Sequence, residues 1–530
     1  MKHNIIFFTL ILSVFCSILQ AQDQPITFNP NILAHSQGLP NDFLLFSPDT
    51  SVQILFNPAR AALSEQRFVY TNYLPNSSSP LTMLQTSSLQ RDNGYRYKSP
   101  NYSGPTISAA TLFDGGGSIW LLQLSNWVYR NAADFNSSTQ ISLQPTYSGN
   151  RLTNSSSLSN GSLTAMKLSK IGTMGNNSYS IGAFGIVFPQ DENSNDNRTN
   201  EEYTPAIPSY SSERHYKYVD KNRSQGKNSK YAFGLEFSLA GSEWDMIVGI
   251  TMQKNEMDGT STYNSNTYNS YKYTSDTNTT IQSMNGTAET KTDNPFVYGL
   301  SGYYRHSSDL ITSTDHYFIS SNIYYSKNSL FYKQNGEGVY WYQRNSNIPD
   351  SDTTNFSLYQ KEQATNWGAA LSFGYLITRK LFDIEILLGF NPRLGYDKFK
   401  NANPLFPYLS SSSIEMASIN EHQIWSTSLQ IPIYLNYTPV NWFSLFGGLN
   451  YKYVYIYERI NGLQQFQQNQ NGQNIVTNQS QTQALSNLNS SSNVYAGMEL
   501  RHASGLHIQI AFRGSIASYS GWNISLGYVY

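Results

Sequence analysis

Cysteine is almost absent from this chain of 530 residues, since the only one is Cys16. It lies within residues 1–21, which have the features of a signal peptide: Lys2 precedes an apolar run, and Ala21 is a small residue that signal peptidase accepts. After cleavage the exported chain has no thiol, which excludes disulfides, zinc–thiolate sites and cysteine nucleophiles. The alternative is a lipoprotein that carries its lipid on Cys16, although Phe15 stands where a small residue usually precedes such a cysteine.

Charge is also scarce. Asp, Glu, Lys and Arg make up 13% of the chain and hydrophobic residues 39%, both below the roughly 25% and 45–50% of typical soluble domains. The formal net charge is -1, so the chain lacks the basic character that nucleic-acid binding requires. Membrane lipid, other envelope proteins and small solutes remain as the expected partners, and nucleic acid does not.

Long apolar runs are missing after residue 21. No stretch of about 18 apolar residues occurs there, so the sequence predicts no transmembrane helix. Aromatic residues, by contrast, reach 14%, with 40 tyrosines, and disordered chains are poor in aromatics. Export without a membrane helix leaves two classes of protein: a secreted soluble β-protein, or a β-barrel that crosses the bilayer with strands.

Apolar and polar residues alternate through much of the chain. At the C-terminus one face of the pattern comprises Trp522, Ile524, Leu526, Tyr528 and Tyr530. The same period of two recurs in residues 367–390, 425–457 and 494–513, and it is typical of strands with one apolar face. We therefore predict an all-β fold, a transmembrane antiparallel up-and-down barrel over residues 65–530.

The predicted connections alternate in length. Short turns fall near residues 241–243, 307–312, 378–381, 438–441 and 502–505, and long polar stretches cover about 189–228, 259–293, 327–363, 397–422 and 460–492. Outer-membrane barrels have this asymmetry, with short periplasmic turns and long extracellular loops. Counting strands gives about 16, with 14 as the alternative. The Ser/Thr/Asn-rich and Gln/Asn-rich stretches are interpreted as solvated loops.

A secreted β-sandwich also has alternating strands and is the competing fold. It does not explain why aromatic residues such as Trp425, Trp442 and Trp522 gather at strand ends. Aromatic girdles at the two lipid–water interfaces do explain it. The barrel is therefore favoured, and its location is the outer membrane of a two-membrane bacterium.

The polar faces of the strands would line the barrel interior. The charged members of this predicted lining are Asp383, Glu385, Arg393, Lys452, Glu458, Glu499, Arg501, His507 and Arg513. A 16-stranded barrel is wide enough for an aqueous channel, and a lining with both signs of charge favours polar or zwitterionic solutes over ions of one sign. The alternative for any one of these residues is an ion pair that only stabilises the wall.

Residues 22–64 do not alternate and contain five prolines, too many for a strand or a long helix. This leader is predicted to fold into the lumen as a plug or to lie beneath the barrel. Within it, Asn57-Pro58-Ala59 resembles the Asn-Pro-Ala-Gly-Leu segment of FadL/OMPP1-type outer-membrane transporters, with Arg60-Ala61 in place of Gly-Leu.

That resemblance has three implications. It places Asn57, Pro58 and Ala59 in an N-terminal hatch, it implies a 14-stranded barrel, and it implies that the solutes include hydrophobic compounds. Barrels that act as secretion-system subunits in Bacteroidota are similar at the same segment. A non-conducting barrel with a structural or secretion role is therefore the alternative function.

Metal binding and catalysis receive little support. Asp191, Asn193, Asn195 and Glu202 have the spacing of a calcium loop, but Asp196 replaces the glycine of the sharp turn, and a solvated acidic loop is the alternative. His306, His316 and His422 have no partner fixed by local spacing. The sequence thus predicts no enzyme and no cofactor, but a channel for passive uptake of small solutes.

Overall fold

The computed structural model describes most of the chain: residues 41–47, 49–78, 103–143, 147–204, 212–273, 277–309, 314–344, 350–407, 414–470, 473–515 and 518–530. The predicted signal peptide, residues 1–21, and the first part of the leader, residues 22–40, lie outside these ranges. In the part of the chain that is described, no helix is both long and apolar enough to cross a bilayer.

Sixteen strands form one closed barrel in which each strand runs antiparallel to its neighbours in the sequence. They are β1 (Phe68–Ser78), β2 (Ser103–Gly115), β3 (Ser118–Leu143), β4 (Tyr147–Met174), β5 (Asn177–Thr204), β6 (Ser212–Ala240), β7 (Trp244–Tyr273), β8 (Thr277–Asp309), β9 (Thr314–Arg344), β10 (Asp350–Leu381), β11 (Ile384–Pro407), β12 (Ile414–Val440), β13 (Phe443–Gln470), β14 (Gln473–Arg501), β15 (Leu506–Ser515) and β16 (Ser518–Val529).

The last strand closes the ring. β16 pairs with β1 from Phe68↔Val529 to Tyr73↔Ile524, and just below them the backbones of Arg67 and Tyr530 exchange two hydrogen bonds of 3.0 and 2.8 Å. A sandwich has two separate sheets, so this closure excludes it. The prediction of an antiparallel up-and-down barrel is confirmed, with sixteen strands and not the fourteen implied by the resemblance.

Tight turns gather at one end of the barrel, which we call the short-turn end. The predicted turns at 241–243 and 502–505 lie there. The turn predicted at 378–381 is displaced: Leu381 still pairs with Ile384, and the turn consists of Phe382, with a positive φ of 54°, and Asp383. Polar residues at a strand end that leaves the membrane resemble a turn in sequence, which explains the displacement.

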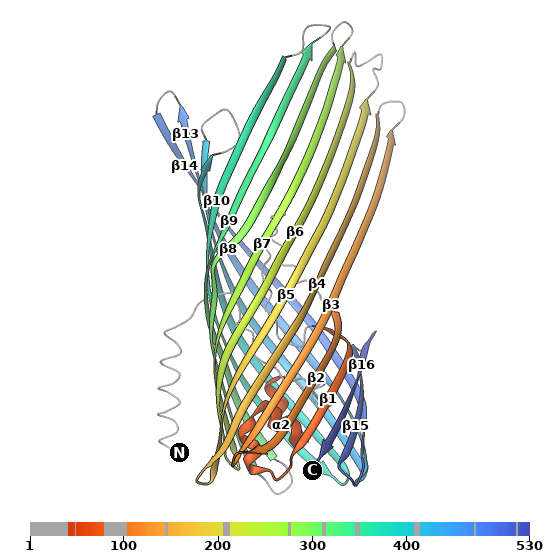
Figure 1. Ribbon diagram of the computed structural model, residues 1–530, viewed down its shortest axis with the longest axis vertical. Coiled ribbons are helices and arrows are strands. Elements are labelled where there is room, and N and C mark those ends of the chain that lie inside the picture. Colours follow the sequence, from red (N-terminus) through yellow and green to blue (C-terminus); the bar gives the residue numbers. More distant parts are fainter. Residues whose placement is uncertain are drawn as a thin grey trace.

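The strands differ greatly in length. β3 to β14 have between 24 and 33 residues, whereas β1, β2, β15 and β16 have between 10 and 13, which is about what a bilayer requires. The polar stretches predicted as long loops are mostly paired strand, as at Asn195↔Arg223 and Tyr263↔Gly286. They extend the wall beyond the membrane as a tall sleeve (Figure 1). We call these extensions of β3–β14 the sleeve.

The outer face of the wall is apolar in a band that adjoins the short-turn end. On β6, for example, Tyr231, Phe233, Leu235 and Phe237 are exposed while the alternate residues Ala232, Ser238 and Ala240 are buried. Four aromatic rings on neighbouring strands form a row along the band, with centroids 6.3 Å apart for Trp367–Tyr396, 5.3 Å for Tyr396–Trp425 and 5.5 Å for Trp425–Tyr457. This row is an aromatic girdle of the kind expected at a lipid–water interface.

The inner face alternates large rings with glycines. The ring of Phe318 on β9 lies over Gly374 on β10, and the ring of Tyr70 on β1 lies over Gly527 on β16, so closely that a Cβ atom at either glycine would overlap the ring. Glycine at these positions lets bulky side chains lie flat against the neighbouring strand. The rings can then fill the interior without pushing the wall outward.

Gly374→Val is expected to destabilise the barrel by about 1–3 kcal/mol, because the added side chain overpacks against Phe318. The measurement is the temperature to which samples must be heated before electrophoresis for the folded form to disappear from the gel. Gly185→Val is the matched control, since a Cβ there meets no atom within 4 Å. Equal transition temperatures for the two variants would contradict the proposed packing.

Candidate functional site: the plug and its attachment

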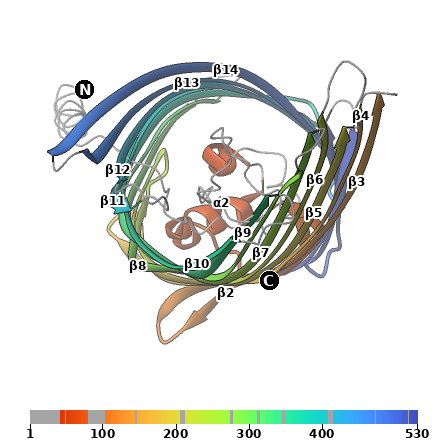
Figure 2. The same cartoon turned by 90° about the horizontal axis from the view of Figure 1, so that it is seen from above.

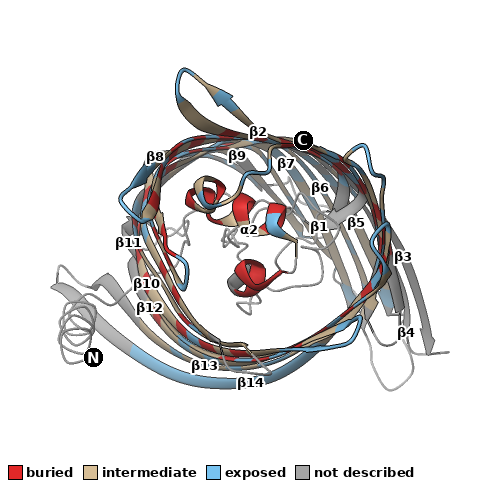
Figure 3. Ribbon diagram, turned by 90° about the horizontal axis from the view of Figure 1, so that it is seen from below, coloured by how far each residue is buried: buried red, intermediate tan, exposed pale blue. Residues whose placement is uncertain are grey.

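Three short helices occupy the barrel interior near the short-turn end. They are η2 (Asn41–Phe46), α2 (Thr50–Phe56) and η3 (Pro58–Leu63), and the two views along the barrel show them inside the ring of strands (Figures 2 and 3). Asp49 starts α2, because its side chain accepts a 2.8 Å hydrogen bond from the backbone N–H of Ser51. We call residues 41–47 and 49–64, which lie inside the ring of strands, the plug.

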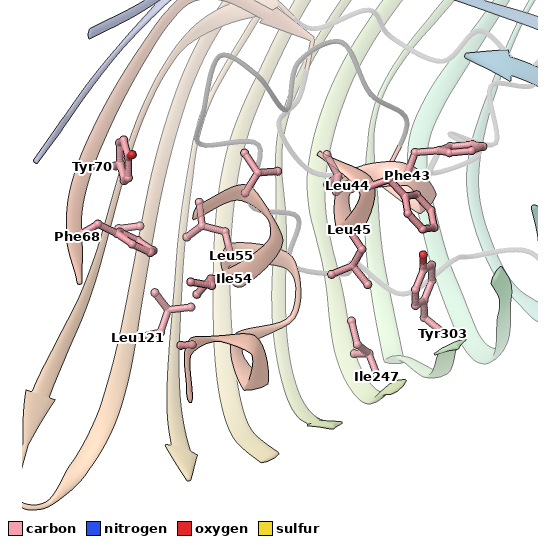
Figure 4. Packing of buried hydrophobic residues seen from close by; sticks show 14 of the residues in the cluster. Phe43, Leu44, Leu45, Ile54, Leu55, Phe68, Tyr70, Leu121, Ile247 and Tyr303 are labelled. Carbon is pink, nitrogen blue, oxygen red and sulfur yellow. The ribbon is translucent and has the colours of Figure 1, made fainter. Parts of the chain in front are cut away.

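The plug packs against apolar side chains of the wall. Phe43, Leu44, Leu45, Ile54 and Leu55 are at most 1% exposed. They share one cluster with inward side chains of the strands, among them Phe68, Leu121, Ile247 and Tyr303, which converge on the helices in Figure 4. Two edge-on ring contacts add to it: Phe43–Phe318 at 5.0 Å and Phe56–Tyr303 at 5.4 Å between centroids. Burial of this surface is the main attraction between plug and wall.

The segment Asn57-Pro58-Ala59 links two helices to the wall. Asn57 ends α2 and caps η3, since its Oδ1 accepts a hydrogen bond from the Ala59 N–H at 3.2 Å. Its Nδ2 donates to the backbone oxygen of Leu239 at 3.1 Å and to Asp245 at 2.7 Å. Pro58 occupies the first helical position, where no N–H is needed, and Ala59 is fully buried.

A buried carboxylate on the wall holds the plug. Asp245, at the start of β7, is 0% exposed, and both its oxygens accept hydrogen bonds from Arg60 at 2.8 Å. Arg305, directly opposite on β8, donates to the same carboxylate at 2.7 Å and to the backbone oxygen of Leu45 in η2 at 2.9 Å. One carboxylate therefore joins two cations and one amide, and these come from both the plug and the wall. We call Asp245, Asn57, Arg60 and Arg305 the Asp245 clamp.

Three further hydrogen bonds attach the plug elsewhere around the ring. Gln123 of β3 donates to the backbone oxygen of Leu55 at 2.9 Å, and Gln509 of β15 donates to Asp49 at 3.2 Å. The third joins Ser51 to the hydroxyl of Tyr70 on β1 at 3.3 Å. These bonds involve neutral groups on at least one side, so the Asp245 clamp is the strongest polar attachment described.

Several predicted lining residues contact one another beside the plug. Glu499, 1% exposed, accepts a 2.6 Å hydrogen bond from Arg501 and lies 3.2 Å from the Nδ1 of His507. Gln509 bridges this carboxylate to Asp49 of the plug, at 3.2 Å on each side. This group acts as a polar edge of the plug seat, not as an open lining.

The other predicted lining residues lie apart from this group. Arg393 and Lys452 lie on the inward faces of β11 and β13, Glu385 lies on the inward face near the short-turn end, and Glu458 pairs with His422 at 2.9 Å. Asp383 is corrected: it lies exposed in the turn after β10, because the turn falls later than predicted. The backbone of Arg513 pairs with Tyr495, and its side chain is outside the described atoms.

The calcium-loop spacing does not form a loop. Asp191, Asn193, Asn195 and Glu202 lie on the extended strand β5, where the first and last are separated by about 36 Å at 3.3 Å per residue. Four such residues cannot bind one ion. Among the histidines, His316 contacts Ser307 at 2.8 Å and Thr378 at 3.3 Å, and neither contact supplies a carboxylate.

The sequence interpretation missed the wall half of the clamp. Asp245 and Arg305 both fall on inward positions of alternating strands, and an isolated acid at such a position was the available signal. Their meeting depends on the register of β7 with β8, which period-two alternation does not reveal. Arg60, which departs from the hatch motif in the sequence, supplies the plug's cation.

These features define a class: a closed transmembrane β-barrel of the outer-membrane type with an N-terminal plug. No family model matches the chain, and no curated protein sequence is similar to it. Among solved structures, it is similar to a FadL homologue of Pseudomonas aeruginosa, at 10% identity over 96% of this chain and 99% of that one, with a TM-score of 0.29.

Two other structures illustrate the same fold class. The FrpB iron transporter of Neisseria meningitidis is 8% identical over 91% of this chain and 83% of its own, with a TM-score of 0.24. The translocator domain of the autotransporter NalP from the same species is 14% identical over 60% of this chain and 87% of its own, with a TM-score of 0.19. Identities and TM-scores this low carry no functional argument for this chain.

Asp245→Asn is expected to loosen the plug, because removing the buried charge leaves Arg60 and Arg305 without their counter-ion, a loss of about 3–5 kcal/mol. Arg60 is the only Lys or Arg between residues 22 and 64, so limited trypsin digestion of the folded protein gives one diagnostic cut. Cleavage after Arg60 should be slow in the unaltered protein and fast in the variant, as followed by intact mass.

Asp114→Asn is the matched control for this substitution. Asp114 forms an exposed ion pair with Arg67 at 2.9 Å, with its own side chain 66% exposed, and such pairs contribute little. Its digestion rate at Arg60 should stay at the unaltered value. Equal protection of Arg60 in both variants would show that the clamp does not retain the plug.

Proposed function

We propose that the protein is a channel in the outer membrane of a two-membrane bacterium, passes small solutes without catalysis, and uses the plug as its gate. The observation that carries this proposal is the Asp245 clamp inside a closed barrel. A plug bound mainly by apolar contacts, with one concentrated polar attachment, can be displaced as a unit. In this orientation the short-turn end, with the plug, faces the periplasm.

The chemistry of the interior supports small solutes of mixed character. Above the plug seat, Arg393, Lys452 and Glu458 present both signs of charge to the lumen. On the opposite part of the wall, Trp127, Phe184 and Phe188 form a second apolar cluster with neighbouring aliphatic side chains. A solute with a polar group and an apolar part, including a hydrophobic compound, finds contacts of both kinds along this path.

Arg60→Gln is expected to raise the time that the channel spends open, because the plug loses its charged bond to Asp245. Single-channel recording in a planar bilayer measures this, and deletion of residues 22–60 should give a permanently open pore of larger conductance. Lys254→Gln, which alters an ion pair with Glu256 on the outer face of the wall, should behave like the unaltered protein. Unchanged conductance after the deletion would refute the gate.

The open pore is expected to select weakly between ions, because its inward charges have both signs. Reversal potentials in a salt gradient should lie near zero for the plug-deleted channel. Lys452→Glu should shift the permeability ratio severalfold towards cations. Lys254→Glu, on the outer face beside Glu256, is the control that should leave the ratio unchanged; a shift of equal size there would mean that Lys452 does not face the conduction path.

A structural or secretion role is the second candidate, and the sleeve favours it. Twelve strands continue well past the length that crosses a bilayer, and a passive pore does not need such a wall. A scaffold of this kind would remain silent in the bilayer even after deletion of residues 22–60. The deletion experiment therefore separates the two candidates.

A further inference from the structure

The sleeve has two unpaired edges. β14 pairs with β15 only from Val494 to Arg501. β3 pairs with β2 only between Thr106↔Trp127 and the short turn at Gly115↔Ser118. Residues 473–493 of β14 and 128–143 of β3 thus have a neighbour on one side alone among the described residues. These edges border a notch in the wall above the four short strands β15, β16, β1 and β2, at the lower right of Figure 1.

The β14 edge lacks the features that normally protect an edge strand. Residues 473–493 contain no charged residue and no proline, and residues 480–491 are exposed. Their pairing with β13 continues without a bulge to Gln470↔Gln473. Proteins usually blunt such an edge with charge, proline or a bulge, because its free N–H and C=O groups otherwise pair with another strand. The β3 edge has only Arg130 and Asp134.

The two edges are complementary in direction. β3 rises from the short-turn end and β14 descends towards it, so the two run antiparallel. Within one chain the described edges do not pair with each other, since the base of the notch between them spans four strands. A two-fold axis along the membrane normal, with the notches of two copies facing each other, brings β14 of one copy to β3 of the other at both sides of the axis at once.

The geometry points to a two-fold dimer of this chain, in which β14 residues 473–493 of each copy pair antiparallel with β3 residues 128–143 of the partner copy. The dimer joins the two open sleeves into one closed wall. Each paired residue contributes roughly one backbone hydrogen bond, and the interface is isologous, as in most homodimers. It does not depend on the proposed function, because it uses only the sleeve.

Cysteine cross-linking tests which edges meet. With Cys16→Ser as background the chain contains no thiol, so copies bearing only Ser486→Cys on β14 can be mixed in membranes with copies bearing only Ser137→Cys on β3. A short bis-maleimide should cross-link the mixture efficiently and either variant alone poorly. Ser283→Cys, on β8 and paired on both sides, is the control and should give no cross-link in any mixture.

Lysine substitutions on the β14 edge test the same interface, and the mass of the assembly is the readout. Native mass spectrometry from nanodiscs should show a dimer for the unaltered protein and a monomer for Asn487→Lys with Asn489→Lys, since charge on an edge opposes pairing. Ser283→Lys with Asn285→Lys in the middle of the sleeve should remain dimeric. A monomeric unaltered protein, a dimer unaffected by the edge lysines, or stronger cross-linking of Ser486→Cys with itself than with Ser137→Cys would each overturn the proposal.

Discussion

The need to pair every backbone N–H and C=O group inside lipid governs this structure. Strands can satisfy it only by closing into a ring, so β16 must find β1, and the two meet in register over six residue pairs. Once the ring is closed, period-two alternation gives every strand one lipid face and one interior face. The few apolar residues suffice because only one face, over one bilayer thickness, must be apolar.

The same closure creates an interior that has to be filled or lined. Near the short-turn end, flat aromatic rings over glycines and the apolar side of three short helices fill it. Burying Asp245 there without partners would be costly, and two guanidinium groups and one amide compensate that cost. One guanidinium comes from the wall and the other from the plug, so the full set of hydrogen bonds to Asp245 forms only when the plug is seated.

Alternation in the sequence is sufficient to predict the fold class, since Trp522 to Tyr530 already shows one lipid face and one inner face. It left sixteen and fourteen strands open, because β1 and β2 are short and irregular at their shared bulge. It misplaced Asp383, because polarity at a strand end resembles a turn. Alternation does not determine register, so the meeting of Asp245 with Arg305 could not be predicted. Plug helices of six or seven residues are too short for a helical period to appear.

Above the membrane the constraint changes, and the wall changes with it. Water can satisfy free N–H and C=O groups there, so strands of a closed barrel no longer need equal height. Twelve strands continue as Ser-, Thr- and Asn-rich ladders while four stop, which is possible only where lipid is absent. At the edges of β3 and β14, water can hydrogen-bond the free backbone N–H and C=O groups. The same groups can still pair with another strand. An edge without charge over residues 473–493 is better suited to a permanent strand partner than to water.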